Sequence, residues 1–315
     1  MEVRIISFST LPPSFFHSTG GEIKKICVSL QTNKPNIQMR QIRLMAFTRL
    51  ATLCLLAFSL AACDKGPFEA HPYDGNYKGK TNLNVTNISR IEDSFRDRDT
   101  IRVAFISDTH LWHKEFNEEV KSINANDSID FVVHCGDFTD TGTTREYEWG
   151  WDIIKKLNKP YVVLIGNHDF LGTGDEVWKK MFGTGLDFSF IAARIKFICI
   201  NTNATEYDYM AAVPNFDYMQ QQFSADSAAF DRTVFVMHAC PGSDQFNNNV
   251  KGMFDYVVKL FPGLQCCIYG HDHSRKATDI FNDGVMWYGI DAAVHRNYQI
   301  FTFTPQGYSY ETVHY

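Results

Sequence analysis

Short apolar runs alternate with amphipathic stretches from Ile101 to the end of the chain, and this alternation constrains the fold most strongly. Six runs of four to six residues have the composition of buried strands: 102–107, 130–134, 161–165, 196–201, 233–237 and 266–269. Helix-like segments lie between several of them, at 114–124, 144–157, 175–182, 217–229 and 250–260. A chain that alternates in this way is expected to form an α/β layered domain. Residues 297–304 and 308–314 predict an antiparallel hairpin around Pro305-Gln306-Gly307.

The length and charge of the chain limit its organisation and its partners. Its 315 residues accommodate one large domain and a short additional segment. The formal net charge of −6 gives no indication of electrostatic attraction to nucleic acid, so specific nucleic-acid binding is not expected. The eight cysteines form no CxxC pair and no regular framework, which argues against a disulfide scaffold or a structural zinc site.

Residues 39–63 have the features of a bacterial lipoprotein signal peptide. The segment starts with a basic region that contains Arg40, Arg43 and Arg49. An uncharged apolar stretch follows at 50–62, too short for a comfortable membrane span, and ends in small residues directly before Cys63. The tetrapeptide Leu60-Ala61-Ala62-Cys63 resembles the lipobox, in which the cysteine carries the lipid. A buried core helix that happens to end in cysteine is the alternative interpretation.

This interpretation divides the chain into four parts. Residues 1–38 precede a start codon at Met39 or Met45 and are expected to be a spurious extension. Residues 39–63 are the signal peptide, 64–100 a polar tether with room for a short helix at 87–95, and 101–315 the main domain. The mature protein is therefore expected in the periplasm or on the cell surface, in contact with the membrane through its lipid anchor only.

Polar side chains follow five of the six predicted strands. Three segments follow the first three strands in turn: Asp108-Thr109-His110, Gly136-Asp137-Phe138-Thr139-Asp140 and Gly166-Asn167-His168-Asp169. His238 follows the fifth strand, and Gly270-His271-Asp272-His273 follows the sixth. Ligand sites in α/β sheets are built at the carboxyl ends of strands, where the loops converge. The five segments therefore predict one site that collects carboxylate, imidazole and amide groups.

Each segment by itself has an ordinary structural explanation. Asp108 or Asp140 could cap a following helix, and His238 could be a partly buried histidine. Gly136-Asp137 and Gly166-Asn167 could form turns. The joint occurrence of metal-type ligands at five strand ends is not explained in this way. An acidic chain that acts on anionic substrates also needs local positive charge, which bound metal ions supply.

In their order along 101–315, the five segments resemble the signature blocks of the calcineurin-like metallophosphoesterase superfamily: D-x-H, G-D-x-x-D, G-N-H-D/E, a lone H, and G-H-x-H. The resemblance implies a four-layer αββα sandwich of two mixed β-sheets, an α/β fold that agrees with the alternation. It also implies a metal-dependent phosphoesterase, in which a water or hydroxide that bridges two metal ions attacks the phosphate.

The resemblance implies a role for each conspicuous residue of the blocks. Asp137 would bridge the two metal ions. The remaining ligands would be Asp108, His110 and His273 for one ion and Asn167, His238 and His271 for the other. Mixed nitrogen and oxygen ligands suit divalent or trivalent manganese, iron or zinc better than calcium. His168 would be the general acid or charge-stabilising group at the leaving oxygen, and Asp140 would orient and polarise it.

Other polar residues near the blocks are expected to have supporting roles. Asp169 and Asp272 are expected to hold loops or the outer shell of the site. His113 and His134 lie near the same loops, and both are expected to be non-catalytic.

Two branches of the family fit the sequence poorly. Purple acid phosphatases have a tyrosine where this chain has Asp140. Serine/threonine protein phosphatases follow their second aspartate with Arg-Gly, where this chain has Thr141-Gly142 and so lacks a phosphate-gripping guanidinium.

The sequence leaves the substrate open among nucleotides, other phosphomonoesters or diesters, and lipid head groups. A nuclease is disfavoured because the chain has no basic stripe. The alternative to an enzyme is a surface binding protein that keeps the fold without turnover. Loss of metal ligands would indicate such a protein, and no ligand of the signature blocks is missing.

Overall fold

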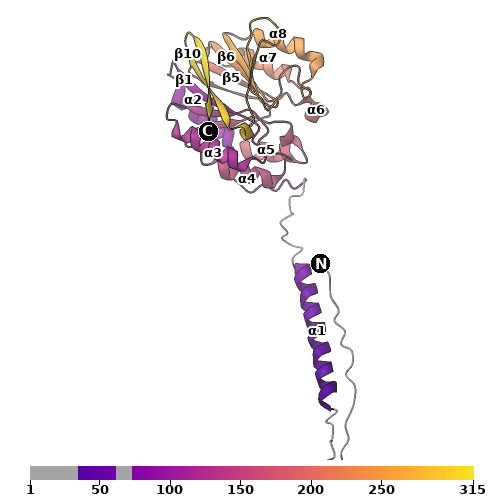
Figure 1. Ribbon diagram of the computed structural model, residues 1–315. Coiled ribbons are helices and arrows are strands. Elements are labelled where there is room, and N and C mark those ends of the chain that lie inside the picture. Colours follow the sequence, from indigo (N-terminus) through magenta and orange to yellow (C-terminus); the bar gives the residue numbers. More distant parts are fainter. Residues whose placement is uncertain (1–34, 62–72) are drawn as a thin grey trace, which may run out of the picture. The chain divides into compact units, whose positions relative to one another are not determined.

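The computed structural model describes residues 35–61 and 73–315, and its contacts divide the chain into two units, Met1–Pro67 and Phe68–Tyr315. The described part of the first unit is one helix, α1 (Pro35–Ala61; Figure 1). No helix within the described ranges combines the length and the apolar character that crossing a membrane requires. Cys63 and residues 1–34 of the predicted extension lie outside the described residues, so the signal-peptide interpretation stays a prediction.

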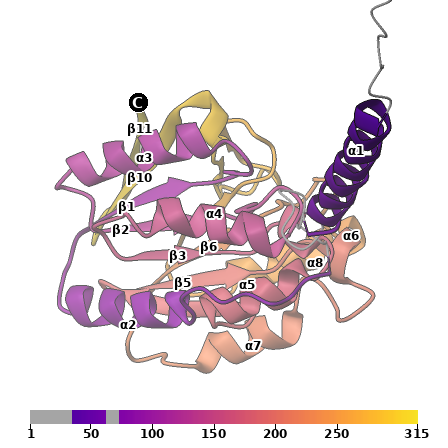
Figure 2. The same cartoon turned by 90° about the horizontal axis from the view of Figure 1, so that it is seen from below.

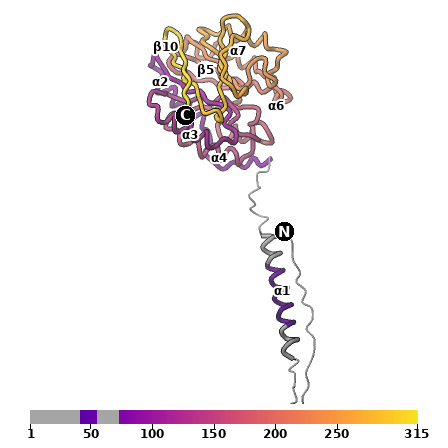
Figure 3. Tube along the Cα trace, viewed as in Figure 1, coloured from indigo at the N-terminus to yellow at the C-terminus, as the bar shows by residue number. Residues whose placement is uncertain are grey.

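The second unit contains two mixed β-sheets. The first sheet has the order β11–β10–β1–β2–β3. Its parallel strands are β1 (Ile101–Ile106), β2 (Phe131–His134) and β3 (Tyr161–Val163), and its antiparallel hairpin is β10 (Asn297–Thr304) and β11 (Gly307–His314). The end of the chain thus returns to the first sheet, where β10 lies beside β1 (Figure 3).

The second sheet has the order β4–β5–β6–β7–β9–β8. Its parallel strands are β5 (Ile195–Ile200), β6 (Arg232–Met237), β7 (Leu264–Tyr269) and β9 (Trp287–Gly289). The antiparallel edge strands are β4 (Phe188–Ala192) and β8 (Lys276–Thr278). All six apolar runs in the sequence therefore form strands, with small shifts at their ends.

Side chains of the second sheet alternate between two hydrophobic cores. Phe197 and Cys199 of β5 belong to the larger core, which both sheets share, whereas Ile198 and Ile200 belong to a smaller core. Residues of α7 (Phe216–Ser224) and α8 (Lys251–Lys259) close the smaller core. Helices α3 (His113–Ala125) and α4 (Thr144–Ile154) cover the first sheet (Figure 2). The architecture is the predicted four-layer αββα sandwich.

Residues 73–100 belong to this body, which corrects the predicted tether 64–100. Helix α2 (Leu83–Phe95) begins earlier than predicted and buries Leu83 and Ile91 in the larger core. The Asn84 side chain donates to Val163 O (2.8 Å) and accepts from Val163 N (2.9 Å), so it occupies the open edge of β3. At the other end of α2, Phe95 O accepts from Ala193 N beside β4 (2.9 Å). The helix therefore covers the edges of both sheets.

Two further differences from the predicted elements have local causes. Helix α7 ends at Ser224 rather than at 229, because Lys196 Nζ donates to the carbonyls of Gln222 (3.0 Å) and Ala225 (2.8 Å). The sequence pattern also missed β4, which joins β5 through Ala193 and Arg194, at φ 50° and 59°. A two-residue hairpin of this conformation usually contains glycine or asparagine, so its sequence signal is weak here. The remaining α-helices in the described ranges are α5 (Gly174–Phe182) and the short α6 (Ala204–Tyr207).

Candidate metal centre

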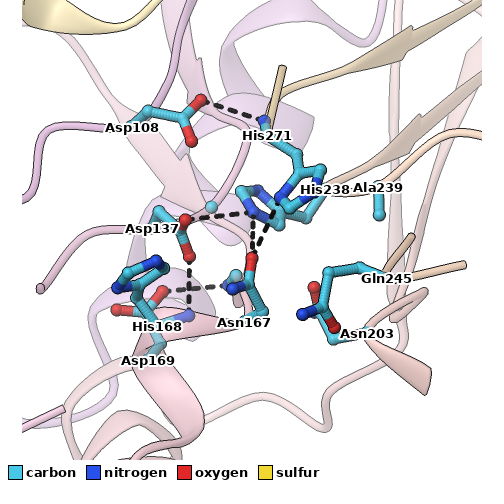
Figure 4. A network of polar contacts seen from close by, with 12 residues as sticks. Asp108, Asp137, Asn167, His168, Asp169, Asn203, His238, Ala239, Gln245 and His271 are labelled. Carbon is cyan, nitrogen blue, oxygen red and sulfur yellow. Dashed lines mark hydrogen bonds and ion pairs between the residues drawn. The ribbon is translucent and has the colours of Figure 1, made fainter. Parts of the chain in front are cut away.

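The five polar segments meet at one edge of the sandwich, beyond the carboxyl ends of β1, β2, β3, β6 and β7 (Figure 4). Their hydrogen bonds cross between the two sheets. His238 Nδ1 lies 2.9 Å from Cys135 O, and His271 N donates to Asp108 Oδ2 (3.1 Å). The structure thus brings together every residue that the sequence assigned to the site, apart from the lipidation residue Cys63, which is not described.

Several residues of the site have a backbone conformation that side chains other than glycine adopt rarely. Positive φ angles occur at Asp108 (51°), His110 (42°), Asp137 (54°), His271 (67°) and His273 (47°). Each such residue costs on the order of 1–3 kcal/mol, and strain of this kind concentrates at functional sites. The surrounding structure therefore stabilises an arrangement of side chains that the local backbone disfavours.

The first group of converging side chains consists of Asp108, His110, Asp137 and His273, whose candidate ligand atoms lie within 4.8 Å of one another. His273 Nε2 lies 3.2 Å from Asp108 Oδ1 and 3.2 Å from His110 Nε2. His110 Nε2 lies 3.6 Å from Asp137 Oδ2. Two imidazoles and two carboxylates thus surround one point.

The second group shares Asp137 with the first. His238 Nε2 lies 3.2 Å from Asp137 Oδ2 and 3.0 Å from Asn167 Oδ1. His271 Nδ1 lies 3.1 Å from the same amide oxygen of Asn167. The oxygen Asp137 Oδ2 therefore faces imidazoles of both groups, a position suited to an anion between two cations.

The donor atoms of both groups fit metal ions. Both ring nitrogens of His238 face acceptor oxygens: Nδ1 faces Cys135 O, and Nε2 faces Asn167 Oδ1 and Asp137 Oδ2. A ring that keeps its proton on Nδ1 offers the Nε2 lone pair to a cation between those oxygens. Asp108 Oδ1 is buried and lies 3.2 Å from His273 Nε2, whose lone pair or proton faces it. Converging lone pairs of this kind are satisfied by a cation.

The charges of the site are strongly coupled. Burial raises the pKa of the Asp137 carboxyl, but His238 and His110 outweigh burial and hold this pKa well below its usual range. Burial lowers the pKa of His238, but Asp137 outweighs it and raises the pKa to about 9. In the metal-free protein a proton on His238 therefore balances a carboxylate, and a bound cation would take the place of that proton.

His168 and Asp140 lie beside the first group, in an arrangement that differs in part from the prediction. His168 Nδ1 lies 2.7 Å from the main-chain carbonyl of Asp140. The Asp140 carboxylate turns instead toward His110, with 3.2 Å between Asp140 Oδ1 and His110 Nδ1. Asp140 therefore orients His168 through its backbone, and the carboxylate–imidazole pair expected from the sequence involves a different histidine.

Asp169 holds two of the loops together. Its buried carboxylate accepts hydrogen bonds from Phe138 N (3.2 Å), Thr139 N (2.9 Å), Thr139 Oγ1 (2.8 Å) and Gly166 N (2.9 Å). Burial raises the pKa of this carboxyl to about 6. Asp272 pairs with Lys276 at 2.5 Å. Asp169 is thus the acid that fixes the relative positions of Asp137 and Asn167.

His134 and His113 lie outside both groups. His134 is fully buried, its Nε2 lies 3.0 Å from Thr109 Oγ1, and burial lowers its pKa to about 3. The ring of His113 lies against Trp149 on the outer surface, with 5.7 Å between the ring centroids. Neither histidine therefore contributes a ring nitrogen to either group of candidate ligands.

Two acidic residues at this edge were not singled out from the sequence. Asp244 Oδ1 lies 2.9 Å from His271 Nε2, and its segment, which lies in an irregular loop, has no periodicity that would have marked it. Asp291 lies just beyond β9 and accepts from His295 Nδ1 at 2.6 Å. Recognition of β9 as a strand would have pointed to Asp291, since ligands gather at the ends of parallel strands.

Known proteins share both sequence and fold with this chain. Residues 101–275 match the family model described as calcineurin-like phosphoesterase. A protein of Arcobacter nitrofigilis named probable glycerophosphodiester phosphodiesterase GpdQ is 34% identical over 80 residues, which cover 21% of this chain and 29% of that protein. The match therefore extends over less than a third of the relative's length.

Two solved structures resemble this chain to different degrees. GAP50, described as the anchor in the inner membrane complex of Plasmodium, has a TM-score of 0.52 at 13% identity, over 69% of this chain and 85% of that chain. A dimetal phosphatase from Danio rerio has a TM-score of 0.49 at 10% identity, over 68% and 99% of the two chains. At these identities GAP50 is similar in fold alone.

Proposed function

We propose that this chain, which belongs to the calcineurin-like phosphoesterase family, hydrolyses phosphate mono- or diesters at a centre of two metal ions. The observation that carries the proposal is the position of Asp137. Its Oδ2 faces His110 Nε2 (3.6 Å) in one group of ligands and His238 Nε2 (3.2 Å) in the other. A carboxylate shared by two clusters of imidazole is the arrangement that a dinuclear centre needs.

The residues at hand divide into two sets of ligands around Asp137. Asp108, His110 and His273 would hold one ion, and Asn167, His238 and His271 the other. The mixture of nitrogen and oxygen donors favours manganese, iron or zinc. When bound, the ions would supply an activated water and offset the negative charge of the phosphate.

In this proposal His168 carries the proton that reaches the leaving oxygen. Its Nδ1 donates to the Asp140 carbonyl (2.7 Å), so a proton for transfer must be carried on Nε2. Its main-chain N–H donates to Asp137 Oδ1 (2.9 Å), which ties the position of the ring to the ligand groups. A protonated Nε2 would stabilise charge on the leaving oxygen or protonate it as the ester bond breaks.

The substrate we propose is a small phosphate ester: a nucleotide, another phosphomonoester or diester, or a lipid head group. The printed name of the A. nitrofigilis relative, a probable glycerophosphodiester phosphodiesterase, supports a diester among these. The net charge of −6 supports the view that nucleic acid is not bound specifically.

Hydrolysis of p-nitrophenyl phosphate and bis-p-nitrophenyl phosphate tests the reaction. Removal of metal with a chelator should abolish turnover by the full-length protein, and addition of manganese should restore it, because every proposed step requires bound cations. The ratio of the hydrolysis rates of the monoester and the diester would show which of these two substrate classes the enzyme prefers. A protein that binds no metal and shows no turnover of either ester would instead be a non-catalytic binding protein of the same fold.

We further propose that the enzyme acts outside the cytoplasm, as a periplasmic or cell-surface lipoprotein anchored through Cys63. The support is the sequence of 39–63, in which arginines precede an apolar stretch and small residues precede the cysteine. In cells that process lipoproteins, the wild type should sediment with membranes. Replacement of Cys63 by alanine should move the protein into the soluble fraction, and a Cys54→Ala variant is the matched control. Equal membrane association of all three proteins would contradict the anchor.

A further inference from the structure

A loop between β6 and α8 carries an acidic residue over the candidate centre. We propose that Asp244 is a positioning residue for His271: it fixes which ring nitrogen of His271 faces the second group of ligands, and it thereby sets the affinity of that group for its ion. The inference rests on the proposed dinuclear function, because it concerns one of the proposed ligands.

The two ring nitrogens of His271 have different neighbours. Nδ1 lies 3.1 Å from Asn167 Oδ1, inside the second group, and Nε2 lies 2.9 Å from Asp244 Oδ1, outside it. Both neighbours are oxygens that accept and cannot donate, but the charged carboxylate of Asp244 is the stronger acceptor, so the proton of a neutral His271 ring resides on Nε2. The lone pair of Nδ1 then faces the point where an ion would be held.

Asp244 is held in place although its side chain is 88% exposed. On one side, the Asn248 side chain accepts from Gly242 N (2.8 Å) and donates to Ser243 O (2.7 Å). On the other side, Gln245 O accepts from Ala204 N (2.9 Å). The neighbouring Phe246 is 3% exposed and packs against Phe254 at a ring distance of 5.2 Å. Both flanks of Asp244 are therefore anchored, which lowers the entropy lost when its carboxylate binds the ring.

Two of the other candidate histidine ligands also have an oxygen of a neighbouring segment close to the ring nitrogen Nδ1. His238 donates from Nδ1 to a carbonyl, that of Cys135 (2.9 Å), and His110 has its Nδ1 3.2 Å from the Asp140 carboxylate. For His238 the contact is a hydrogen bond, and for His110 it is a short distance to a carboxylate. Asp244 provides such a contact for Nε2 of His271, and loss of such an outer partner typically weakens metal binding about 10–100-fold.

Calorimetric titration of manganese into the metal-free, full-length protein tests the proposal. Asp244→Ala should weaken binding of the second ion by about 10–100-fold and leave the first ion unchanged. Asp244→Asn should fall between the wild type and Asp244→Ala, because its amide oxygen can still accept from Nε2 but carries no charge. Asp208→Ala removes an exposed aspartate elsewhere and should bind both ions as the wild type does.

The possible results of the titration distinguish a positioning role of Asp244 from a merely structural role and from no role. Equal affinity of the wild type and Asp244→Ala for both ions would overturn the inference, while turnover by the wild type would leave the proposed function intact. An equal loss of both ions, with a lowered melting temperature, would assign Asp244 a merely structural role and would also overturn it. A wild type that binds no manganese, zinc or iron would refute the proposed function and the inference together.

Discussion

Asp137→Asn should lower kcat for both nitrophenyl esters by at least about 10³-fold, the upper end of what one preorganised electrostatic group contributes. Asparagine keeps the size of the side chain but removes its charge and leaves a single oxygen as ligand. In the structure Asp137 Oδ2 faces both groups of imidazoles, and Oδ1 accepts from His168 N (2.9 Å). One substitution therefore weakens both metal positions and the support of His168. Steady-state kinetics at saturating manganese measures the effect.

An exposed carboxylate distinguishes this loss from a general effect of charge. Asp208→Asn changes the net charge by the same amount, and its kcat should equal that of the wild type. Melting temperatures of both variants show whether the fold is retained. An Asp137→Asn protein that keeps a tenth or more of the wild-type kcat would exclude Asp137 as a bridging ligand.

His168→Ala should lower kcat by about 10²–10⁴-fold with a smaller change in KM, because the ring acts on the leaving oxygen rather than on binding. The variant should still bind metal, since the donor atoms that converge in the two ligand groups do not include those of the His168 ring. His314→Ala removes an exposed histidine near the chain end and should retain wild-type kinetics.

The leaving group provides a sharper test of the same residue. p-Nitrophenolate leaves readily without a proton, whereas an alkoxide does not. If His168 is a general acid, the loss of kcat in His168→Ala should be larger for an alkyl phosphate than for p-nitrophenyl phosphate. An equal loss for both esters would assign His168 to charge stabilisation rather than to proton transfer.

The layered fold could be predicted because its strands are short apolar runs that the two cores bury. Phe197 and Ile198 of β5 face different cores, so the run reads as continuously apolar and is easy to recognise. Edge elements were harder to predict. Helix α2 has a polar outer face and follows a polar stretch, and its role depends on Asn84, whose bonds to Val163 span 79 residues of sequence. No local sequence pattern indicates a contact between residues that lie so far apart in the chain.

The composition of the site could be predicted for a similar reason. Asp108, Asn167 and His271 each follow an apolar run, so the rule that parallel strands end at one edge places them together. The partners of these residues could not be predicted. Asp140 binds His168 through its carbonyl, and main-chain carbonyls carry no sequence signal. Asp244 lies in an irregular loop, whose path depends on packing of Phe246 and on the Asn248 side chain.

The metal content of the protein tests the central claim of a dinuclear centre most directly. Wild type and Asp137→Asn would be reconstituted side by side with manganese, freed of excess metal and analysed for ions per chain. We predict two ions per wild-type chain, and one or none in Asp137→Asn together with the loss of turnover. A wild type that is fully active with one ion, or an Asp137→Asn protein that holds two, would contradict the account.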